Sequence, residues 1–246
     1  MLRGVAEPEA AAPGAPRIER FDASPLVLPG VRVLQMLYEI EAEQASDLLP
    51  PALHPTLPPA VSWLIYDCPD TPWGPMRLAQ TRIECRSGTR PRGFLVSGVC
   101  TEARAASALA ERWGYRLELG EISCRWGYDE VRCAVALGGE TVLELALRDP
   151  SHLDPGNIQF VAGMHPAHTP QGFRLVQCDP THAEIEAERG LPILEDFDGE
   201  AWGDERIEPA HPISGARCVA DVTLPALRFV CKPGELAFTG TERVQA

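Results

Sequence analysis

Proline and glycine interrupt this sequence at intervals that constrain its fold more than any other feature. The 246 residues include 24 prolines and 21 glycines, and short apolar runs lie between them. Most of these runs follow one another without an intervening helical pattern, which argues against a helical bundle and against a doubly wound parallel sheet. We therefore expect an α+β fold, mainly β, with a mostly antiparallel sheet.

The pattern predicts strands in both halves of the chain and two short helices. Residues 42–49 and 103–112 have the composition of helices. We expect Thr101 to accept hydrogen bonds from the first turn of the second helix, and Gly114 to end that helix in the left-handed conformation. Hairpin turns are expected at 127–130 and at 138–139. The predicted strands are 31–40, 61–68, 76–85, 94–100, 117–126, 131–137, 141–147, 172–178, 181–188 and 216–224.

The segment after the second helix resembles a known family. In acetoacetate decarboxylases a Glu, an aromatic residue, a Pro and two lysines follow in that order, and the first lysine forms a Schiff base with a β-keto acid. Here Glu111 matches the Glu and Tyr115 the aromatic residue, whereas Arg116 replaces the Pro. Leu117 and Glu118 replace the two lysines, so a hydrocarbon stands in the position of the nucleophile.

Other segments resemble the same superfamily in the same order. Residues 38–51 resemble its strand and helix that end in Leu-Pro-Pro, 60–74 include an Asp-Thr pair found before its next strand, and 219–225 resemble its closing strand. The resemblance covers residues 25–232 and implies a cone-shaped antiparallel β-barrel with peripheral short helices around a small-molecule site. It also implies a homo-oligomer, because the family commonly assembles.

The chain is expected to form one domain, since nothing in its middle resembles a linker. Residues 1–20 are predicted to be a disordered lead-in, residues 21–232 the barrel, and residues 233–246 a tail. The first 17 residues lack a basic start followed by an apolar core, which argues against a signal peptide or a transmembrane segment.

Charge and cysteine usage limit the expected partners and compartment. The net charge of -13 disfavours nucleic acid and anionic membranes, because phosphate binding needs a basic surface. The eight cysteines stand singly, without a C-x-x-C pair, as is typical of reduced, buried cysteines in a cytoplasmic protein. A disulfide set or a thiolate zinc site is the alternative.

The resemblance implies that the site chemistry has changed. The family's carboxylate-binding Arg falls on Glu39, its first Glu on Leu64, and its second Glu near Leu78, where a slip of one or two residues is possible. Because Leu117 cannot form an imine, we predict that the protein does not decarboxylate acetoacetate by the family mechanism.

Small residues in the strand before the second helix predict a changed pocket. Ser97 and Gly98 stand where the decarboxylases carry large apolar side chains. With the three leucines, they predict a larger and more apolar cavity, suited to a bulkier organic ligand. The alternative is that the side chains were repacked and the barrel is filled.

Glu118 and Glu39 are the candidate catalytic residues. A carboxyl group in an apolar barrel has a raised pKa that suits acid–base chemistry near neutral pH. Strand alternation leaves open that Glu118 faces solvent if Leu117 points inward. Glu111 is expected to support the helix by pairing with an Arg, and Tyr115 either donates its hydroxyl in the pocket or belongs to the core. The candidate substrate-binding residues are Leu64, Leu78, Ser97, Gly98, Glu111, Tyr115, Arg116 and Leu117.

No cofactor and no metal are predicted. Two imidazoles spaced like those of His165 and His168 can hold an ion, but a zinc site needs a third ligand that the sequence does not identify. A solvated loop is the simpler interpretation of that segment. The sequence has no Gly-rich phosphate loop, G-x-S-x-G elbow or dinucleotide fingerprint.

Two functions remain open. The first is an enzyme of specialised metabolism that acts on a keto, enol or polyketide-type substrate by non-imine lyase, dehydratase or cyclase chemistry. The second is a non-catalytic small-molecule-binding protein on the same barrel. A catalytic pocket needs an acid or base within reach of the ligand, whereas a carrier pocket can be lined by hydrocarbon alone.

Overall fold

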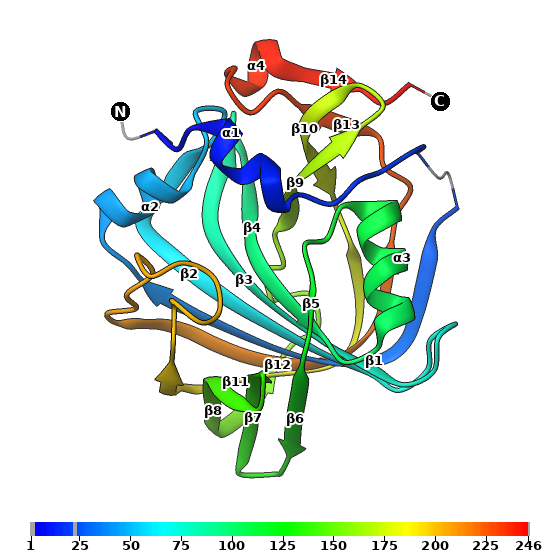
Figure 1. The fold of residues 1–246 in the computed structure, drawn as a ribbon. Coiled ribbons are helices and arrows are strands. Elements are labelled where there is room, and N and C mark those ends of the chain that lie inside the picture. The colour runs from blue at the N-terminus through cyan, green and yellow to red at the C-terminus, as the bar shows by residue number, and fades with distance from the viewer. Residues whose placement is uncertain (1–2, 22–23, 246) are drawn as a thin grey trace.

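The computed structural model describes residues 3–21 and 24–245, and their strands form one large sheet. The sheet has 14 strands in the order β14-β13-β10-β9-β4-β3-β2-β1-β12-β11-β8-β7-β6, with β5 paired to β4. Its long central strands curve into a cone-like sheet that is not closed in the described residues, because the end strands β14 and β6 do not pair, and α3 covers one side (Figure 1). The pairs are antiparallel except β4 with β5 and β4 with β9. The mainly β prediction is therefore confirmed.

The strands of the first half are β1 (Leu26–Glu39), β2 (His54–Cys68), β3 (Met76–Ser87), β4 (Arg90–Cys100), β5 (Glu118–Leu119), β6 (Glu121–Trp126) and β7 (Glu130–Leu137). Those of the second half are β8 (Glu140–Leu153), β9 (Ala162–Thr169), β10 (Gly172–Cys178), β11 (Thr181–Phe197), β12 (Pro212–Leu224), β13 (Phe229–Cys231) and β14 (Thr241–Arg243). The helices are α1 (Pro8–Ala11), α2 (Ala42–Leu48), α3 (Ala103–Trp113) and α4 (Ala237–Gly240), with one 3-10 turn, η1 (Ala12–Gly14).

Alternating side chains give the sheet two apolar faces. On β2, Trp63 and Ile65 belong to one buried cluster, and Leu64 and Tyr66 to the other. The first cluster, which we call the α2 core, includes Leu48 of α2 and residues of β6 to β8. The second, the α3 core, includes Leu109 of α3 and residues of β1 to β4, β10 and β12. Each strand therefore contributes to two packed layers.

The end of α3 follows the prediction, but its start does not. Gly114 has φ 71°, and its N–H donates to the carbonyls of Ala110 and Leu109. At the start, the cap is Glu102, whose side chain accepts a hydrogen bond from the Arg104 N–H. Thr101 instead accepts from the N–H of Arg77 at 2.9 Å, so its hydroxyl connects α3 to β3.

The N-terminal segment is packed against the barrel, contrary to the predicted disordered lead-in. The Gly4 N–H donates to the Leu53 carbonyl at 2.8 Å, and Ile18 is 1% exposed. The Ile18 N–H also donates to the His168 carbonyl of β9, and the His168 N–H donates to the Pro16 carbonyl. Backbone hydrogen bonds and the burial of Ile18 in the α3 core hold this Ala- and Pro-rich stretch in place. Residues 1–2 of the predicted lead-in lie outside the described residues.

The C-terminal segment also continues the fold beyond residue 232. Strand β14 pairs with β13, and α4 lies between them in the sequence (Figure 1). Residues 233–245 therefore extend the sheet, where a tail was expected. Residue 246 lies outside the described part.

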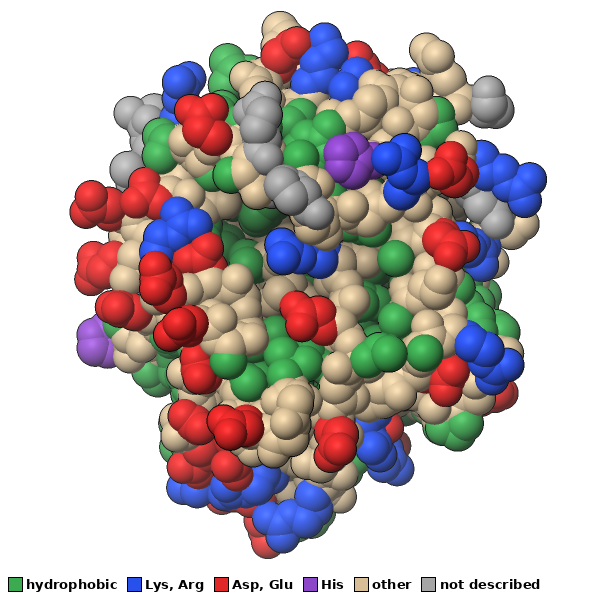
Figure 2. Space-filling view, viewed as in Figure 1, with side chains coloured by type: hydrophobic (Ala, Val, Ile, Leu, Met, Phe, Trp, Pro, Cys, Tyr) green, Lys and Arg blue, Asp and Glu red, His purple; other side chains and the backbone are tan. Residues whose placement is uncertain are grey.

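The surface agrees with the acidic composition. On the face in Figure 2, Asp and Glu side chains gather over α2 and along the lower left edge, whereas Lys and Arg are dispersed. In the described part of the chain, no helix has the length and apolar character needed to cross a membrane.

Candidate active site

Leu117 lies between α3 and β5 and packs against the α3 core. A Cβ atom built on Gly98 would lie 2.7 Å from Leu117 Cδ2, so the room beside Gly98 is filled by Leu117. Leu64, Leu78 and Tyr115 are buried in the same core. The structure thus brings together five of the predicted site residues.

The cavity beside these residues is apolar but small. Its volume is about 20 Å³, which is room for about one water molecule. The described residues therefore leave less space here than the larger cavity that was expected. The lining residues are Leu28, Tyr66, Cys68, Met76, Leu78, Leu109, Tyr115, Pro180, Val222 and Leu224.

Four predicted site residues lie elsewhere. Glu118 is exposed at the short strand β5, so its carboxyl is not shielded from water as expected. Glu111 is exposed on α3 and accepts a hydrogen bond from the Ser107 hydroxyl at 2.7 Å, in place of the expected Arg. Arg116 is exposed, and its guanidinium lies over Gly14.

Ser97 is the fourth, because it points to the opposite face of β4 from Gly98. Its hydroxyl lies 3.4 Å from the position of a Cβ built on Gly203, beside the α2 core. Alternation along the strand separates the two adjacent positions.

Glu39 remains at the margin of the site. It is half-buried at the end of β1, on the strand face that carries Val33 of the α3 core. Its backbone N–H donates to the His211 carbonyl at 2.8 Å.

A row of polar residues on β3 was missed from the sequence. Gln80, Arg82 and Glu84 alternate with Ala79 and Ile83 and therefore face the side of Leu78. All three are buried: Gln80 is 0%, Arg82 1% and Glu84 6% exposed. The row places charge inside the apolar barrel.

Arg82 has few partners for a buried guanidinium. It donates to the Gln80 side-chain carbonyl and, at 3.3 Å, to the backbone carbonyl of Val161. Within the described residues it forms no ion pair, and its Nε and the Gln80 Nε2 have no hydrogen-bond partner. A buried cation is costly without a paired anion, so this position suits an anionic oxygen supplied by a ligand.

Glu84 is the buried carboxyl of the row. The Ser62 hydroxyl lies 2.6 Å from its Oε1. Burial raises the pKa of Glu84 to about 7, against the lowering effects of the Ser62 hydrogen bond and the Arg82 charge. A carboxyl with that pKa can both donate and accept a proton near neutral pH.

The two predicted loop histidines lie on β9 and do not share an ion site. His165 Nδ1 is 2.9 Å from the Trp113 carbonyl, and burial lowers the pKa of His165 to about 3. His168 Nε2 is 3.1 Å from the Ala12 carbonyl, on the other face of the strand. Among the residues that the structure describes, no group of three or more His, Cys, Asp or Glu could hold a metal.

His165 and Tyr115 complete the polar edge of the α3 core. Their ring centroids are 4.2 Å apart, and His165 Nε2 has no hydrogen-bond partner within the described chain. The Tyr115 hydroxyl lies 3.8 Å from the Cys178 sulfur, and burial raises the pKa of Tyr115 well above its usual value.

A sequence model of the acetoacetate decarboxylase family matches residues 11–230. The chain belongs to this family. Among solved structures, the acetoacetate decarboxylase from Legionella pneumophila subsp. pneumophila str. Philadelphia 1 has 20% identity and a TM-score of 0.73, with 92% of this chain and 95% of that chain covered. No curated protein matches the sequence.

Two further relatives by structure carry other descriptions. The enduracididine biosynthesis enzyme MppR, complexed with pyruvate, has 19% identity and a TM-score of 0.68, with 84% of this chain and 90% of that chain covered. An acetoacetate decarboxylase-like enzyme from Sphingomonas wittichii RW1 has 15% identity and a TM-score of 0.68, with 92% and 94% covered. At these identities the likeness concerns the fold.

The sequence resemblance contained one signal for the missed residues. A slip of two residues moves the family's second Glu from Leu78 to Gln80, which lies next to Arg82 on the same face of β3. Alternating polar residues are otherwise typical of the solvent face of a strand, and this is why the row was not recognised.

Proposed function

We propose that this member of the acetoacetate decarboxylase family is an enzyme that acts on a small keto or enol substrate by non-imine chemistry. The observation that carries the proposal is the buried row on β3, with Arg82 unpaired by a carboxylate and Glu84 titrating near neutral pH. Leu117 replaces the imine-forming lysine, so the substrate carbonyl must be activated by hydrogen bonds or charge.

The buried row on β3 contains the two kinds of group that enolisation requires, a base and a partner that stabilises the enolate oxygen. Removing a proton from the carbon beside a carbonyl requires a base, and the resulting enolate oxygen requires a positive or hydrogen-bonding partner. Glu84 serves as the base, and Arg82 with the Gln80 amide stabilises the oxygen. Lyase, dehydratase and cyclase reactions on polyketide-type substrates share this enolate step. MppR, on the same fold, is described with bound pyruvate, which is a keto acid.

Ligand entry requires side-chain movement, because the cavity holds about 20 Å³. Leu117 is half-buried at the edge of the α3 core, so rotation of its side chain opens space beside Gly98. A larger substrate therefore binds by displacing Leu117 from Gly98.

Hydrogen–deuterium exchange tests the proposal without knowledge of the full reaction. The protein is incubated in D₂O with a panel of β-keto acids, 1,3-diketones and aryl polyketide mimics, and exchange at the carbon between the carbonyls is followed by NMR. Wild type should accelerate exchange of at least one compound, and Glu84→Gln should lower that rate about a hundredfold or more. Glu118→Gln is the matched control, and its rate should equal that of wild type.

Two results would contradict the proposal. A wild-type exchange rate in Glu84→Gln would remove this residue from the mechanism and return attention to Glu39. Binding of panel compounds without any acceleration of exchange would support the alternative of a non-catalytic binding protein.

Compartment and assembly are part of the same proposal. The eight cysteines are all free, which supports a reducing, cytoplasmic setting.

A homo-oligomer is supported by the family resemblance and by exposed apolar side chains such as Leu57 and Tyr128, 77% and 88% exposed. Light scattering that gives a monomer mass over a wide concentration range would overturn the assembly.

A further inference from the structure

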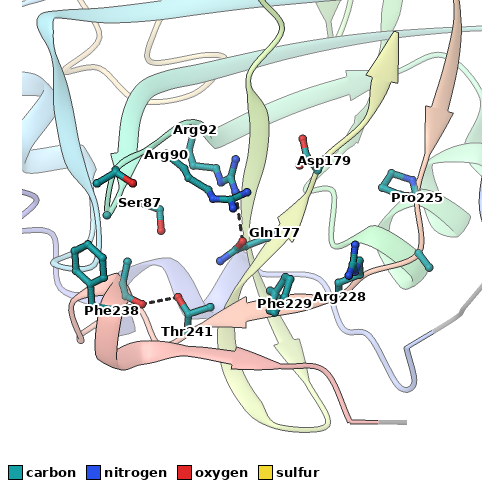
Figure 3. Close-up of a pocket in the computed structure, with 14 residues that line it drawn as sticks. Ser87, Arg90, Arg92, Gln177, Asp179, Pro225, Arg228, Phe229, Phe238 and Thr241 are labelled. Carbon is teal, nitrogen blue, oxygen red and sulfur yellow. Dashed lines mark hydrogen bonds between the residues drawn. The ribbon is translucent and has the colours of Figure 1, made fainter. Parts of the chain in front are cut away.

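A second cleft lies over the sheet face opposite the α3 core. It is bounded by the hairpin between β3 and β4, the end of β10, the segment 225–229 and α4 (Figure 3). On β10, Val176 belongs to the α3 core, whereas its neighbour Gln177 lines the cleft. The volume is about 360 Å³, within the range of small-molecule sites. The cleft is therefore separate from the candidate active site.

Positive charge is concentrated in this cleft. Arg90, Arg92 and Arg228 line it, and Asp179 is the single carboxylate among the lining residues, so three positive charges face one negative charge and leave +2. The whole chain has a net charge of -13. Arg90 and Arg92 extend toward Gln177 in Figure 3, with Arg228 on the far side of β10. This local excess of positive charge favours the binding of anions in the cleft, although the protein as a whole is acidic.

Arg92 is the buried arginine of the cleft. It is 7% exposed, and its Nε has no hydrogen-bond partner within the described chain. Its two terminal nitrogens contact the Pro91 carbonyl at 3.1 Å and the Gln177 side-chain carbonyl at 3.5 Å. These acceptors are neutral, and Arg92 forms no ion pair within the described residues, although the charge of Asp179 acts on it from the same cleft.

Aromatic rings form the rest of the wall. Phe238 of α4 is 82% exposed and lies against Gly88, where a built Cβ would be 3.4 Å from its ring. Phe229 is 39% exposed, and the Arg228 guanidinium lies 5.8 Å from the centre of its ring. Exposed rings beside arginines favour a ligand with a flat apolar part.

We infer that this cleft binds an organic phosphomonoester that carries a planar ring. A phosphomonoester has nearly two negative charges at pH 7, which matches the +2 of the lining, and its oxygens accept the paired N–H groups of arginine. The phosphate contacts Arg92 and Arg90, and the ring packs against Phe238. Neither the active-site row nor Leu117 takes part.

Calorimetric titration of the full chain with phenyl phosphate, inorganic phosphate and phenol tests this site. Phenyl phosphate should bind at least tenfold more tightly than inorganic phosphate, and phenol should not bind measurably. Arg90→Gln, at an exposed position that does not threaten folding, should weaken phenyl phosphate at least fivefold, and Arg92→Gln at least tenfold. Phe238→Ala should weaken phenyl phosphate but leave inorganic phosphate unchanged. Arg189→Gln, an exposed arginine on β11, is the matched control and should bind as wild type does.

Several outcomes would overturn the site. One is equal affinity in wild type and in both arginine variants, and another is absence of phenyl phosphate binding at millimolar concentration. Loss of binding in Arg82→Met would assign the ligand to the α3 core. A lower oligomeric mass of Phe238→Ala in light scattering would show that the cleft is an interface between copies of the chain.

Discussion

Leu117 packs directly against Gly98, so the position that the sequence resemblance assigns to the family's nucleophile holds a hydrocarbon side chain beside a residue without one. A Cβ at position 98 would lie 2.7 Å from Leu117 Cδ2 and 3.0 Å from the Ala79 carbonyl oxygen. The first distance is too short for two carbon atoms, so Gly98 is required wherever Leu117 holds this conformation. Leu117 and Gly98 thus form one packing arrangement.

Gly98→Ala should lower the free energy of unfolding by about 1–3 kcal/mol, because Leu117 or the backbone must move. Urea unfolding measures the change. Gly234→Ala is the matched control, since no atom lies within 4 Å of a Cβ there, and it should change stability by less than about 0.5 kcal/mol. In Gly98→Ala with Leu117→Ala, the combined loss should be smaller than the sum of the single losses by more than about 0.5 kcal/mol. Additive effects would show that the two residues do not compete for space.

Borohydride in the presence of acetoacetate should leave no covalent adduct on a side chain. The sole lysine is Lys232, whose amine lies 2.8 Å from a Glu235 oxygen. The Glu235 hydrogen bond and charge raise the pKa of Lys232, which keeps the amine protonated at neutral pH. Intact-mass and peptide mass spectrometry provide the measurement, with Lys232→Arg as the control. A stable mass increase on Lys232 would contradict the expectation.

Much of the fold could be predicted because proline, glycine and strand alternation are local signals. The helix 42–49 lies within one residue of α2, and four predicted strands of the first half overlap β1 to β4. The observed β1, β2 and β4 begin four to seven residues before the predicted starts. The strand β9 was missed because His165-Pro-Ala-His168 contains polar and proline residues typical of a loop. Its pairing with β4 and β10 is a long-range interaction that local composition does not encode.

The candidate site was harder to predict than the fold, because the direction of a side chain depends on register. Glu118 was expected to face the cavity, yet β5 is two residues long and leaves it exposed. Arg82 was overlooked, since an arginine in an alternating strand ordinarily marks the solvent side. The sequence identifies these residues, but it does not specify on which face of the sheet each side chain lies.

Stability should fall with rising pH because of Glu84. Its pKa rises from 4.5 to about 7 on folding. Below pH 4.5 both states are protonated, and between 4.5 and 7 the unfolded state loses its proton while the folded state keeps it. The free energy of unfolding therefore decreases through this window and levels off above it, by about 3 kcal/mol in all. Glu84→Gln should remove this decrease in urea unfolding from pH 4.5 to 8. Parallel pH profiles for the two proteins would contradict the assignment.

Cys124 and Cys133 should be the pair that oxidises first. They face each other across β6 and β7, and the Cys133 sulfur lies 2.8 Å from the Cys124 sulfur. That separation is near the 2.05 Å of a disulfide, and directly opposed residues of antiparallel strands have Cα spacings that a disulfide accepts. Treatment with diamide should remove two of the eight thiols, which leaves six. Cys124→Ser should keep all of its remaining seven, and a crosslink elsewhere in the peptide map would contradict the pairing.

Arg82→Met should abolish the acceleration of deuterium exchange without lowering the free energy of unfolding. Methionine keeps the length of the side chain and removes a buried cation that has only neutral hydrogen-bond partners, Gln80 and the Val161 carbonyl. Replacing a buried charge by an apolar group of similar volume is often neutral or stabilising by about 1–4 kcal/mol, although here two acceptors are left unsatisfied. We therefore expect a free energy of unfolding equal to or above that of wild type, with the acceleration of deuterium exchange lost. The pKa of Glu84 should rise further in this variant, because the Arg82 charge lowers it in wild type. If Arg82→Met instead lowers the free energy of unfolding by several kcal/mol and leaves deuterium exchange intact, Arg82 has a structural role. A residue retained for ligand binding can be replaced without such a loss of stability.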